Sequence, residues 1–257
     1  MAEKSEFDTE TTARHYAAAR PTYPSELFDA LDELLAHELA GAVVVDVAAG
    51  TGIASRQLAE RGAQVTAVEL SAAMLSELAA ASPGVHAVQG SGHALPLADD
   101  CADLITYAQA WHWMDPEPAL AEARRVLRPH GVLALWWNQT DRSTGWERKQ
   151  AERITAAVGS DWNRYSATEI AAHVTLPEDL TRHAFTFDWD RVVTLDTHLS
   201  NLASKSYIAG LGAQTEPFLA NERALLLELF PDQQLTEKFT TLLIAALIGE
   251  NLTIAAR

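Results

Sequence analysis

The chain has 257 residues, with 35 acidic side chains against 19 basic ones, and the resulting net charge of −16 argues against a general nucleic-acid binder. Hydrophobic residues (48%) and charged residues (21%) are near globular averages, and the length is ample for a substantial core. The chain has a single cysteine, Cys101, so we expect no internal disulfide. Its first residues are polar, and its longest clean apolar run is 242–248, so we expect neither a secretory signal nor a membrane partner. These features predict a cytoplasmic protein.

Strands and helices alternate between residues 25 and 138. Apolar runs, several of them β-branched, predict strands over 42–47, 64–68, 85–88, 103–107 and 131–137. Helices are predicted from Ser25 to a terminating Gly41, over 53–61, from Ser71, and over 115–127. This order is typical of an α/β protein with a doubly wound, mostly parallel, Rossmann-like sheet.

The alternation ends after Asn138. The second half predicts helices over 145–180 and 196–249, with short strands at 184–187 and 252–256. No Pro-, Gly- or Ser-rich linker separates the halves, so we predict one domain over 1–257. Within it we expect a cofactor-binding core at 25–138 and a mainly helical substrate cover at 139–250.

The first strand runs into a turn of small residues, Asp-Val-Ala-Ala-Gly-Thr-Gly at 46–52. Ligands of open parallel sheets bind at the carboxyl ends of the strands. Small residues there let the backbone pass close to a ligand, and the following helix presents unpaired N–H groups. Glu69 ends the second strand, where an acid can accept both hydroxyls of a ribose.

Two other nucleotide-binding patterns fit this turn poorly. A dinucleotide fingerprint needs glycine or alanine at position 55, where Ser55 stands. A phosphate-binding P-loop needs Gly-Lys-Ser/Thr, but Ile53 follows Gly52. A hydride-transfer enzyme therefore stays an open but weaker alternative, and the P-loop interpretation fails.

Six segments carry motifs in chain order. They are Tyr-x-x-x-Arg-Pro-x-Tyr-Pro at 16–24, the turn at 44–52, Val-Glu-Leu-Ser-x-x-Met-Leu at 68–75, the loop at 89–97, Ala-Gln-Ala-Trp-His-Trp-Met-Asp at 108–115 and Arg-Val-Leu-Arg-Pro-His-Gly-Val-Leu at 125–133. Together they resemble the class I S-adenosylmethionine (SAM)-dependent methyltransferases, in particular the small-molecule branch with the ubiquinone/menaquinone and trans-aconitate methyltransferases. Ala48 and His130 stand where the commonest family motifs have glycine.

The resemblance implies SAM as the cofactor. It implies that Asp46 orients the glycine turn or the cofactor's amino group, and that Glu69 holds the ribose. Arg20 could pair with the cofactor's carboxylate, because guanidinium binds carboxylates in a two-pronged way. The predicted cofactor-binding residues are Tyr16, Arg20, Asp46, Ala48, Gly50, Gly52, Glu69, Leu70, Met74, Gly90, Ser91, Gly92, Gln109 and Trp111.

His112 is the candidate general base, because it follows the fourth strand and imidazole titrates near neutrality. A base is needed only if the acceptor must lose a proton. Trp113, Trp137 and Asn138 are predicted to contact the acceptor, and the aromatic residues favour one with an apolar or aromatic part. The cations Arg142, Arg148, Lys149 and Arg153 either attract an anionic substrate or form a solvated helix face. No metal-ligand spacing is present.

The leading hypothesis is a SAM-dependent methyltransferase that acts on a small organic molecule, with a place in secondary metabolism and a homodimer as further expectations. One alternative is a SAM-bound scaffold that catalyses a cyclisation or rearrangement. A regulatory protein with a degenerate site is another alternative. The acceptor atom, whether oxygen, nitrogen or carbon, stays open.

Overall fold

The computed structural model describes residues 19–35, 37–142, 145–159, 170, 174, 176–177 and 180–248. In this part of the chain seven strands form one sheet in the order β3-β2-β1-β4-β5-β7-β6. Neighbours from β3 to β5 are parallel, whereas β7 runs antiparallel to both β5 and β6. The strands are β1 (Val43–Val47), β2 (Gln64–Glu69), β3 (His86–Gln89), β4 (Ala102–Ala108), β5 (Leu127–Thr140), β6 (Thr181–Thr194) and β7 (Gln234–Leu247). The mostly parallel Rossmann-like sheet is therefore confirmed.

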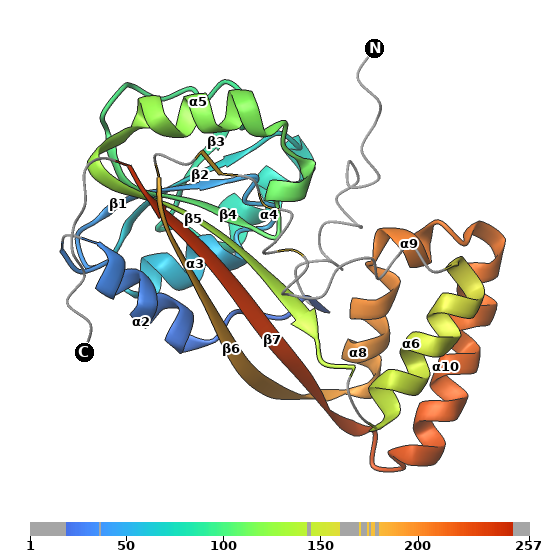
Figure 1. Cartoon of the computed structure of the whole chain (residues 1–257). Helices are drawn as coiled ribbons and strands as arrows, with labels where there is room; N and C mark the ends of the chain where they lie inside the picture. The colour runs from blue at the N-terminus through green and yellow to red at the C-terminus, as the bar shows by residue number, and fades with distance from the viewer. Residues whose placement is uncertain are drawn as a thin grey trace.

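Alternate residues of the central strands point into two hydrophobic layers. Val44 and Leu104 pack against α2 (Ser25–Leu34), α3 (Ile53–Glu60) and α4 (Ala72–Ala81) on one face. Val45 and Ile105 pack on the opposite face, which α5 (Pro116–Val126) covers. Figure 1 shows α5 on one side of the sheet, with α2 and α3 on the other. Because both faces are covered, these strands are mostly apolar instead of alternating between apolar and polar residues.

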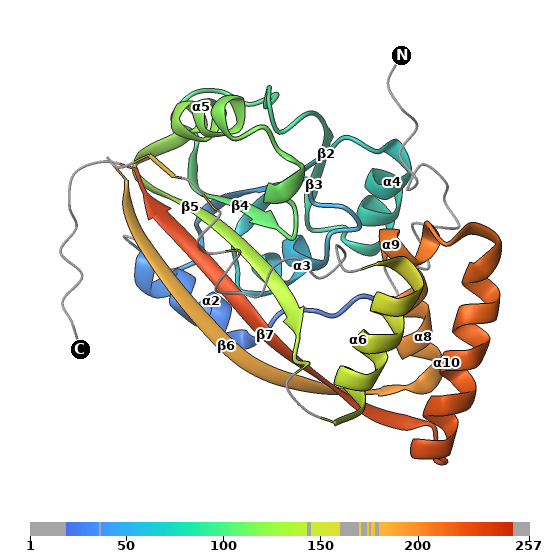
Figure 2. The ribbon, with the colours of Figure 1, turned by 45° about the vertical axis from the view of Figure 1, so that its right-hand side comes forward.

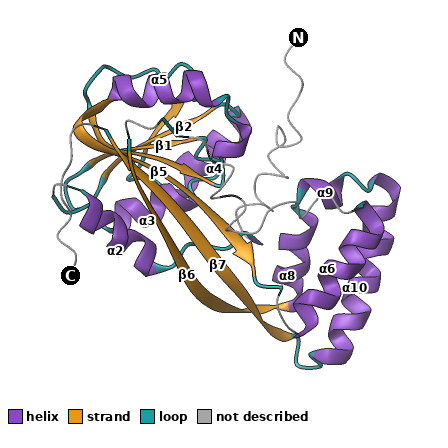
Figure 3. Cartoon of the chain, in the orientation of Figure 1, coloured by secondary structure: helices purple, strands orange, loops and turns teal. Residues whose placement is uncertain are grey.

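Three long strands extend past the parallel part of the sheet. β5 stays paired with β7 as far as Thr140, beyond the last residue that it pairs with β4, and β6 accompanies β7 along its whole length. A helical group packs at this far end, as Figures 2 and 3 show. It consists of α6 (Gly145–Val158), α8 (Leu195–Ala203), α9 (Ser206–Ala209) and α10 (Thr215–Leu229).

The prediction of helix throughout 196–249 is wrong at its C-terminal end. The helices end at Leu229, and Gln234–Leu247 form β7 between β5 and β6. The second half of β7 is buried on both faces, so its side chains give an unbroken apolar run. Such a run cannot be told from a buried helix by periodicity alone.

The predicted strand at 184–187 is the middle of the 14-residue β6, whose residues alternate between more and less exposed along its length. The segment 139–250 therefore holds the two long strands β6 and β7 in addition to its helices. The first part of the helix predicted over 145–180 is observed as α6. Most of the segment from 160 to 180 lies outside the described residues, and so does the strand predicted at 252–256.

The first helix is shorter than predicted. It ends at Leu34, with Pro24 at its N-cap and Ser25 as its first residue. Gly41 instead adopts a φ of 89° in the turn that leads into β1. The N-caps predicted at Ser71 and Asp115 are confirmed, because each side chain accepts a hydrogen bond from the first turn of its helix. Among the described residues, no helix is long and apolar enough to cross a membrane.

Arg125 on α5 fixes the loop between β3 and β4. Its guanidinium donates to the backbone oxygens of Leu95 and Leu97, at 3.1 and 2.8 Å, and to the carboxylates of Asp99 and Glu122. Hydrogen bonds of a charged donor to carboxylates are among the stronger ones in proteins. One side chain therefore attaches the 90–101 loop to the helix beside it.

We predict that Arg125→Met lowers the free energy of unfolding by about 2 kcal/mol, because it removes charge-assisted hydrogen bonds and leaves backbone oxygens without a donor. Urea unfolding measures the loss, and amide hydrogen exchange in 90–101 should accelerate. Lys149→Met, which removes an exposed cation of α6, is the matched control and should have little effect. Equal stabilities of the two variants would contradict the assignment.

Candidate active site

The turn after β1 has an unusual backbone conformation. Ala48, Gly50 and Gly52 all have positive φ, at 53°, 58° and 78°. A Cβ added at Gly52 would lie 2.7 Å from Leu78 Cγ, so this position admits only glycine. At Gly50 an added Cβ would meet nothing within 4 Å. The turn therefore borders open space on the side of Gly50, as a ligand-binding loop requires.

Glu69 joins this turn to the start of α4. One carboxylate oxygen accepts a hydrogen bond from the Gly50 N–H and the other from the Ser71 N–H, each at 2.8 Å. A carboxylate oxygen can accept two hydrogen bonds, so each of these still has acceptor capacity. Glu69 is thus fixed at the end of β2 and can still receive hydroxyl donors.

Asp46 is completely buried in β1. It accepts hydrogen bonds from Ser55 Oγ at 2.5 Å and from Thr106 Oγ1 at 2.8 Å. Burial raises the pKa of its carboxyl from 3.8 to about 6, although both hydroxyls oppose the shift. Of the two roles predicted for Asp46, this geometry fits orientation of the glycine turn, because Ser55 stands in the first turn of α3.

The loop after β3 packs tightly. A Cβ at Gly90 would come within 2.8 Å of Pro96 Cδ, and one at Gly92 within 2.9 Å of Met114 Sδ. Ser91 Oγ accepts from the His93 N–H at 3.2 Å. Leu70 is 68% exposed at the neighbouring end of β2, whereas Met74 is buried. This edge combines an exposed apolar side chain with closely packed glycines, which suits a flat ring.

The segment after β4 presents the aromatic residues. Gln109 has a φ of 59°, and its N–H donates to the Trp136 oxygen at 2.8 Å, which ties the segment to β5. Trp111 is buried edge-on against Tyr107, with ring centroids 5.0 Å apart. Trp113 is 66% exposed. The two tryptophans thus differ, since Trp111 belongs to the core and Trp113 faces outward.

His112 accepts a long hydrogen bond at Nδ1 from Trp137 Nε1–H, at 3.4 Å. Its ring also lies against Trp113, with centroids 4.8 Å apart. Removal of water by the surrounding protein lowers the pKa of this imidazole. The lowered pKa favours the neutral ring, in which the Trp137 hydrogen bond to Nδ1 leaves the proton on Nε2.

Asn138 and Arg20 contact other parts of the protein. Asn138 donates to the Thr22 oxygen at 2.8 Å and accepts from Thr241 Oγ1 at 2.6 Å, so the amide fixes the segment before α2 to the sheet. Arg20 donates to the Ser204 oxygen, just after α8, at 3.1 Å. Tyr16 lies outside the described residues.

Comparison with known proteins agrees with this geometry. A sequence model described as a methyltransferase domain matches residues 45–135. The chain is 38% identical over 229 residues to the uncharacterized methyltransferase Rv3342 of Mycobacterium tuberculosis, an alignment that spans 82% of this chain and 88% of that protein. The chain therefore belongs to the class I SAM-dependent methyltransferases.

Two further relatives are more distant. The malonyl-[acyl-carrier protein] O-methyltransferase of Pectobacterium atrosepticum is 36% identical over 120 residues, 45% of this chain and 47% of that one. A solved structure from Anaeromyxobacter dehalogenans, described as a proposed type II methyltransferase, superposes with a TM-score of 0.68 at 23% identity, over 88% and 97% of the two chains. This likeness to a solved structure supports the fold alone. As a member of its family, this chain uses SAM as the methyl donor.

A pocket of about 480 Å³ of empty space, partly open to solvent, lies where the far end of β5 meets the helical group. It is lined by Thr140, Arg142, Trp146, Glu147, Gln150, Ala151, Ile154, His198, Asn201, Leu202, Lys205, Tyr207 and Glu237. Among these residues, only Arg142 is a candidate identified from the sequence. Glu237 gave no signal in the sequence, because its segment was predicted as helix and its neighbours, Thr236 and Lys238, are polar.

The raised pKa of Asp46 gives the methyltransferase a testable pH dependence. A buried acid with a folded pKa near 6 against 3.8 unfolded binds more protons when folded, so its contribution to stability falls as pH rises from about 4 to 7. The variant Asp46→Asn has no carboxyl at this position, so it does not lose this stability as pH rises. The stability of the variant relative to the parent should therefore rise by up to about 3 kcal/mol across that range, as measured by urea unfolding.

Asp103→Asn is the control, because its relative stability should change with pH in the opposite direction. Burial alone would raise the pKa of Asp103, but hydrogen bonds from the Val43 N–H and Arg128 together lower it. The relative stability of this variant should therefore fall as pH rises, because the parent gains stability when Asp103 ionises. Curves of the same slope for both variants would contradict the assignment for Asp46.

Proposed function

We propose that this methyltransferase holds SAM along the carboxyl ends of β1 and β2 and methylates a small organic molecule with an apolar or aromatic part. SAM supplies a methyl group on a sulfonium for in-line attack, so the protein acts mainly by positioning donor and acceptor. The observation that carries this proposal is the Glu69 carboxylate, held by two backbone N–H groups beside the open side of the glycine turn.

The described residues fit the cofactor in three respects. The remaining acceptor capacity of Glu69 suits the two ribose hydroxyls. Exposed Leu70 and the loop at 90–92 suit the adenine ring, with Ser91 Oγ beside it. Asp46 would act on the cofactor indirectly. It accepts hydrogen bonds from Ser55 and Thr106 and thereby holds the turn at 48–52 in place.

Other predicted residues keep their roles as part of this proposal. Gln109 and Trp111 would border the adenosine, and Arg20 would approach the cofactor's carboxylate from the segment that it links to α8. Asn138 has both ends of its amide engaged, so we assign it the positioning of the segment around Thr22.

On the acceptor side, Trp113 and Trp137 would form aromatic walls beside His112. The Nδ1 lone pair of His112 faces Trp137, which leaves Nε2–H to donate a hydrogen bond. This supports a role in which His112 holds an acceptor oxygen or nitrogen by donation. To act as a general base through Nδ1, His112 would have to lose the hydrogen bond from Trp137. Substitutions can separate the donor role from the base role.

We predict that Glu69→Gln weakens S-adenosylhomocysteine binding by roughly tenfold or more, because an amide donates where the ribose hydroxyls need an acceptor. Calorimetric titration measures the affinity. Glu60→Gln, at the exposed end of α3, is the matched control and should bind like the parent. A parent chain that binds neither SAM nor S-adenosylhomocysteine would falsify the proposed function.

For His112, the pair His112→Gln and His112→Ala separates donor from base. The alanine variant should lower kcat by roughly 10- to 100-fold, since a positioning hydrogen bond is lost. The glutamine variant, whose amide can donate but cannot take up a proton, should recover part of that loss. Transfer of label from SAM to an acceptor found by screening gives kcat, and S-adenosylhomocysteine affinity should stay unchanged. Equal losses in both variants would point to the general base instead.

A further inference from the structure

Residues 19–23, which we call the entry segment, are bonded to the edge of the sheet where the cofactor site is proposed. The backbone of Tyr23 and the side chain of Gln57 of α3 exchange two hydrogen bonds, at 2.9 and 2.8 Å. Asn138 Nδ2 donates to the Thr22 oxygen at 2.8 Å. These contacts fix the entry segment between α3, whose first turn follows the glycine turn, and the part of β5 that extends past β4.

The entry segment is also bonded to the far end of the long strands, where the helical group packs. Arg20 Nη2 donates to the backbone oxygen of Ser204, just after α8, at 3.1 Å. Arg191 Nη2, from β6, donates to the Ala19 oxygen at 3.0 Å. Two neighbouring residues of the entry segment are therefore held from the side of the helical group.

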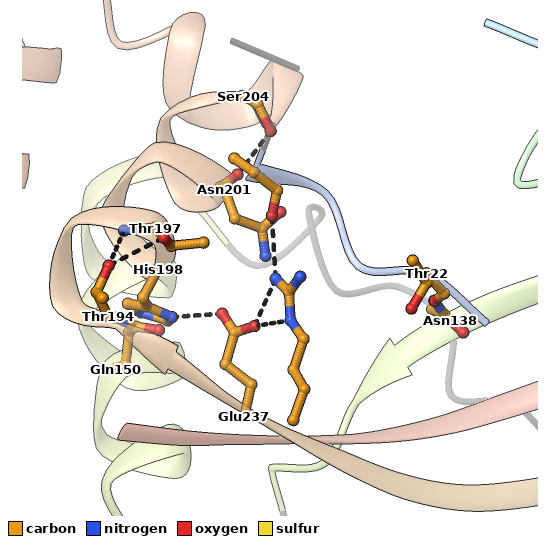
Figure 4. A network of polar contacts seen from close by, with 11 residues as sticks. Thr22, Asn138, Gln150, Thr194, Thr197, His198, Asn201, Ser204 and Glu237 are labelled. Atoms are coloured by element: carbon orange, nitrogen blue, oxygen red, sulfur yellow. Dashed lines mark hydrogen bonds and ion pairs between the residues drawn. The ribbon is translucent and has the colours of Figure 1, made fainter. Parts of the chain in front are cut away.

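Glu237 of β7 holds Arg191 in place. Its carboxylate is buried, and one oxygen accepts from Arg191 Nε at 2.7 Å and lies at the same distance from Nη2. The other oxygen accepts from His198 Nδ1 of α8 at 2.6 Å. Figure 4 shows Glu237 directed at His198. Because charge-assisted hydrogen bonds of this kind are strong, they fix the guanidinium in the position from which it reaches Ala19.

The series of polar contacts continues into the helical group. Gln150 Nε2 of α6 lies 3.0 Å from His198 Nε2 and donates to Glu222 of α10, also at 3.0 Å. Glu222 in turn binds Arg153 of α6. His198, Gln150 and Glu222 are buried, and a buried polar network whose members have partners is rigid. One connected series of contacts therefore runs from the entry segment to the interior of the helical group.

The apolar cores of the two parts are separate. In the described part of the chain, the buried apolar residues around the helical group form two small clusters that share no member with the two layers of the sheet. They are Leu195, Leu199, Leu226 and Leu235 in one cluster, and Ile154, Leu202 and Ile208 in the other. A part of a protein with its own small core can open while the rest stays folded. The order of the helical group relative to the cofactor edge then depends on the long strands and on the polar series.

We propose that Arg191 and Glu237 are positioning residues of the cofactor site, which hold the entry segment in place and couple cofactor binding to the order of the helical group. This inference rests on the proposed function, because it requires the cofactor to contact the entry segment. A ligand that immobilises 19–23 also immobilises Arg191, and through Glu237 and His198 it stabilises α8. Coupling of this kind is reciprocal, so loss of the connection weakens cofactor binding.

Amide hydrogen exchange with and without saturating S-adenosylhomocysteine tests the coupling on the unaltered chain. We expect slower exchange at 48–52 and 69–71, where the ligand would bind directly. We also expect exchange in α8 and α9 to slow by roughly fivefold, although these helices lie beyond the entry segment.

Arg191→Met interrupts the series at the entry segment. With saturating ligand it should abolish the slowing in α8 and α9 and keep the slowing at 48–52 and 69–71. Calorimetry should show an affinity for S-adenosylhomocysteine that is roughly fivefold weaker. Arg223→Met, which removes an exposed ion pair between α10 and Asp196 of α8, is the matched control and should behave like the parent chain.

The double variant Arg191→Met/Glu237→Gln keeps the test available if the single variant does not fold. It removes both charges of the buried pair, so neither is left alone. It should show the same loss of slowing and the same weaker affinity. Exchange in α8 that stays slower than in the urea-unfolded chain verifies that the helices are intact in each variant.

Three outcomes would overturn the inference. They are a ligand-bound parent chain without slower exchange in α8 and α9, a double variant that keeps this slowing, and unchanged affinity in both variants. A parent chain that binds S-adenosylhomocysteine and slows only at 48–52 and 69–71 defeats the coupling and leaves the proposed function intact. A parent chain that does not bind the ligand defeats both.

Discussion

The edge of the sheet where the cofactor site is proposed depends on one carboxylate buried in its middle. Asp46 of β1 lies directly opposite Thr106 of β4 in the strand register, and it accepts hydrogen bonds from Thr106 and from Ser55 of α3. A buried charge is costly, and its pKa near 6 records that cost. In return, two strands and the first turn of α3 are held in one arrangement, and this constrains the turn at 48–52.

Glu69, at the end of the adjacent strand, differs from Asp46 because it borders the open side of the turn. Its carboxylate joins Gly50 to Ser71 and therefore fixes the ends of β1 and β2 relative to one another. It also borders the open side of the turn, where a ligand can reach it. Of the two acids identified from sequence, Asp46 thus supports the turn from within, and Glu69 is the one that we propose to contact the cofactor. Position along the strand separates these roles, since Asp46 lies opposite Ala67 in the register, whereas Glu69 is the last residue of β2.

The parallel part of the fold could be predicted from sequence because its determinants are local. Val43–Val47 and Ala102–Ala108 are mostly apolar, and the caps at Ser71 and Asp115 act within one helical turn. The placement of β7 is not local, because it is inserted between β5 and β6 by antiparallel pairing. Its apolar second half therefore resembled a helix. The lining of the pocket was missed for the same reason, since Lys205, Asn201 and Glu237 come together only through that pairing.

The long strands also connect the edge of the sheet where the cofactor site is proposed to the pocket at the far end of β5. The Gln109 segment is bonded to Trp136 of β5, and the same strand continues through Trp137 and Asn138 to Thr140 at the pocket. β7 accompanies it and carries Glu237 to the pocket lining. Because one strand carries both places, the pairing of β5 with β7 sets where the pocket lies relative to the segment after β4.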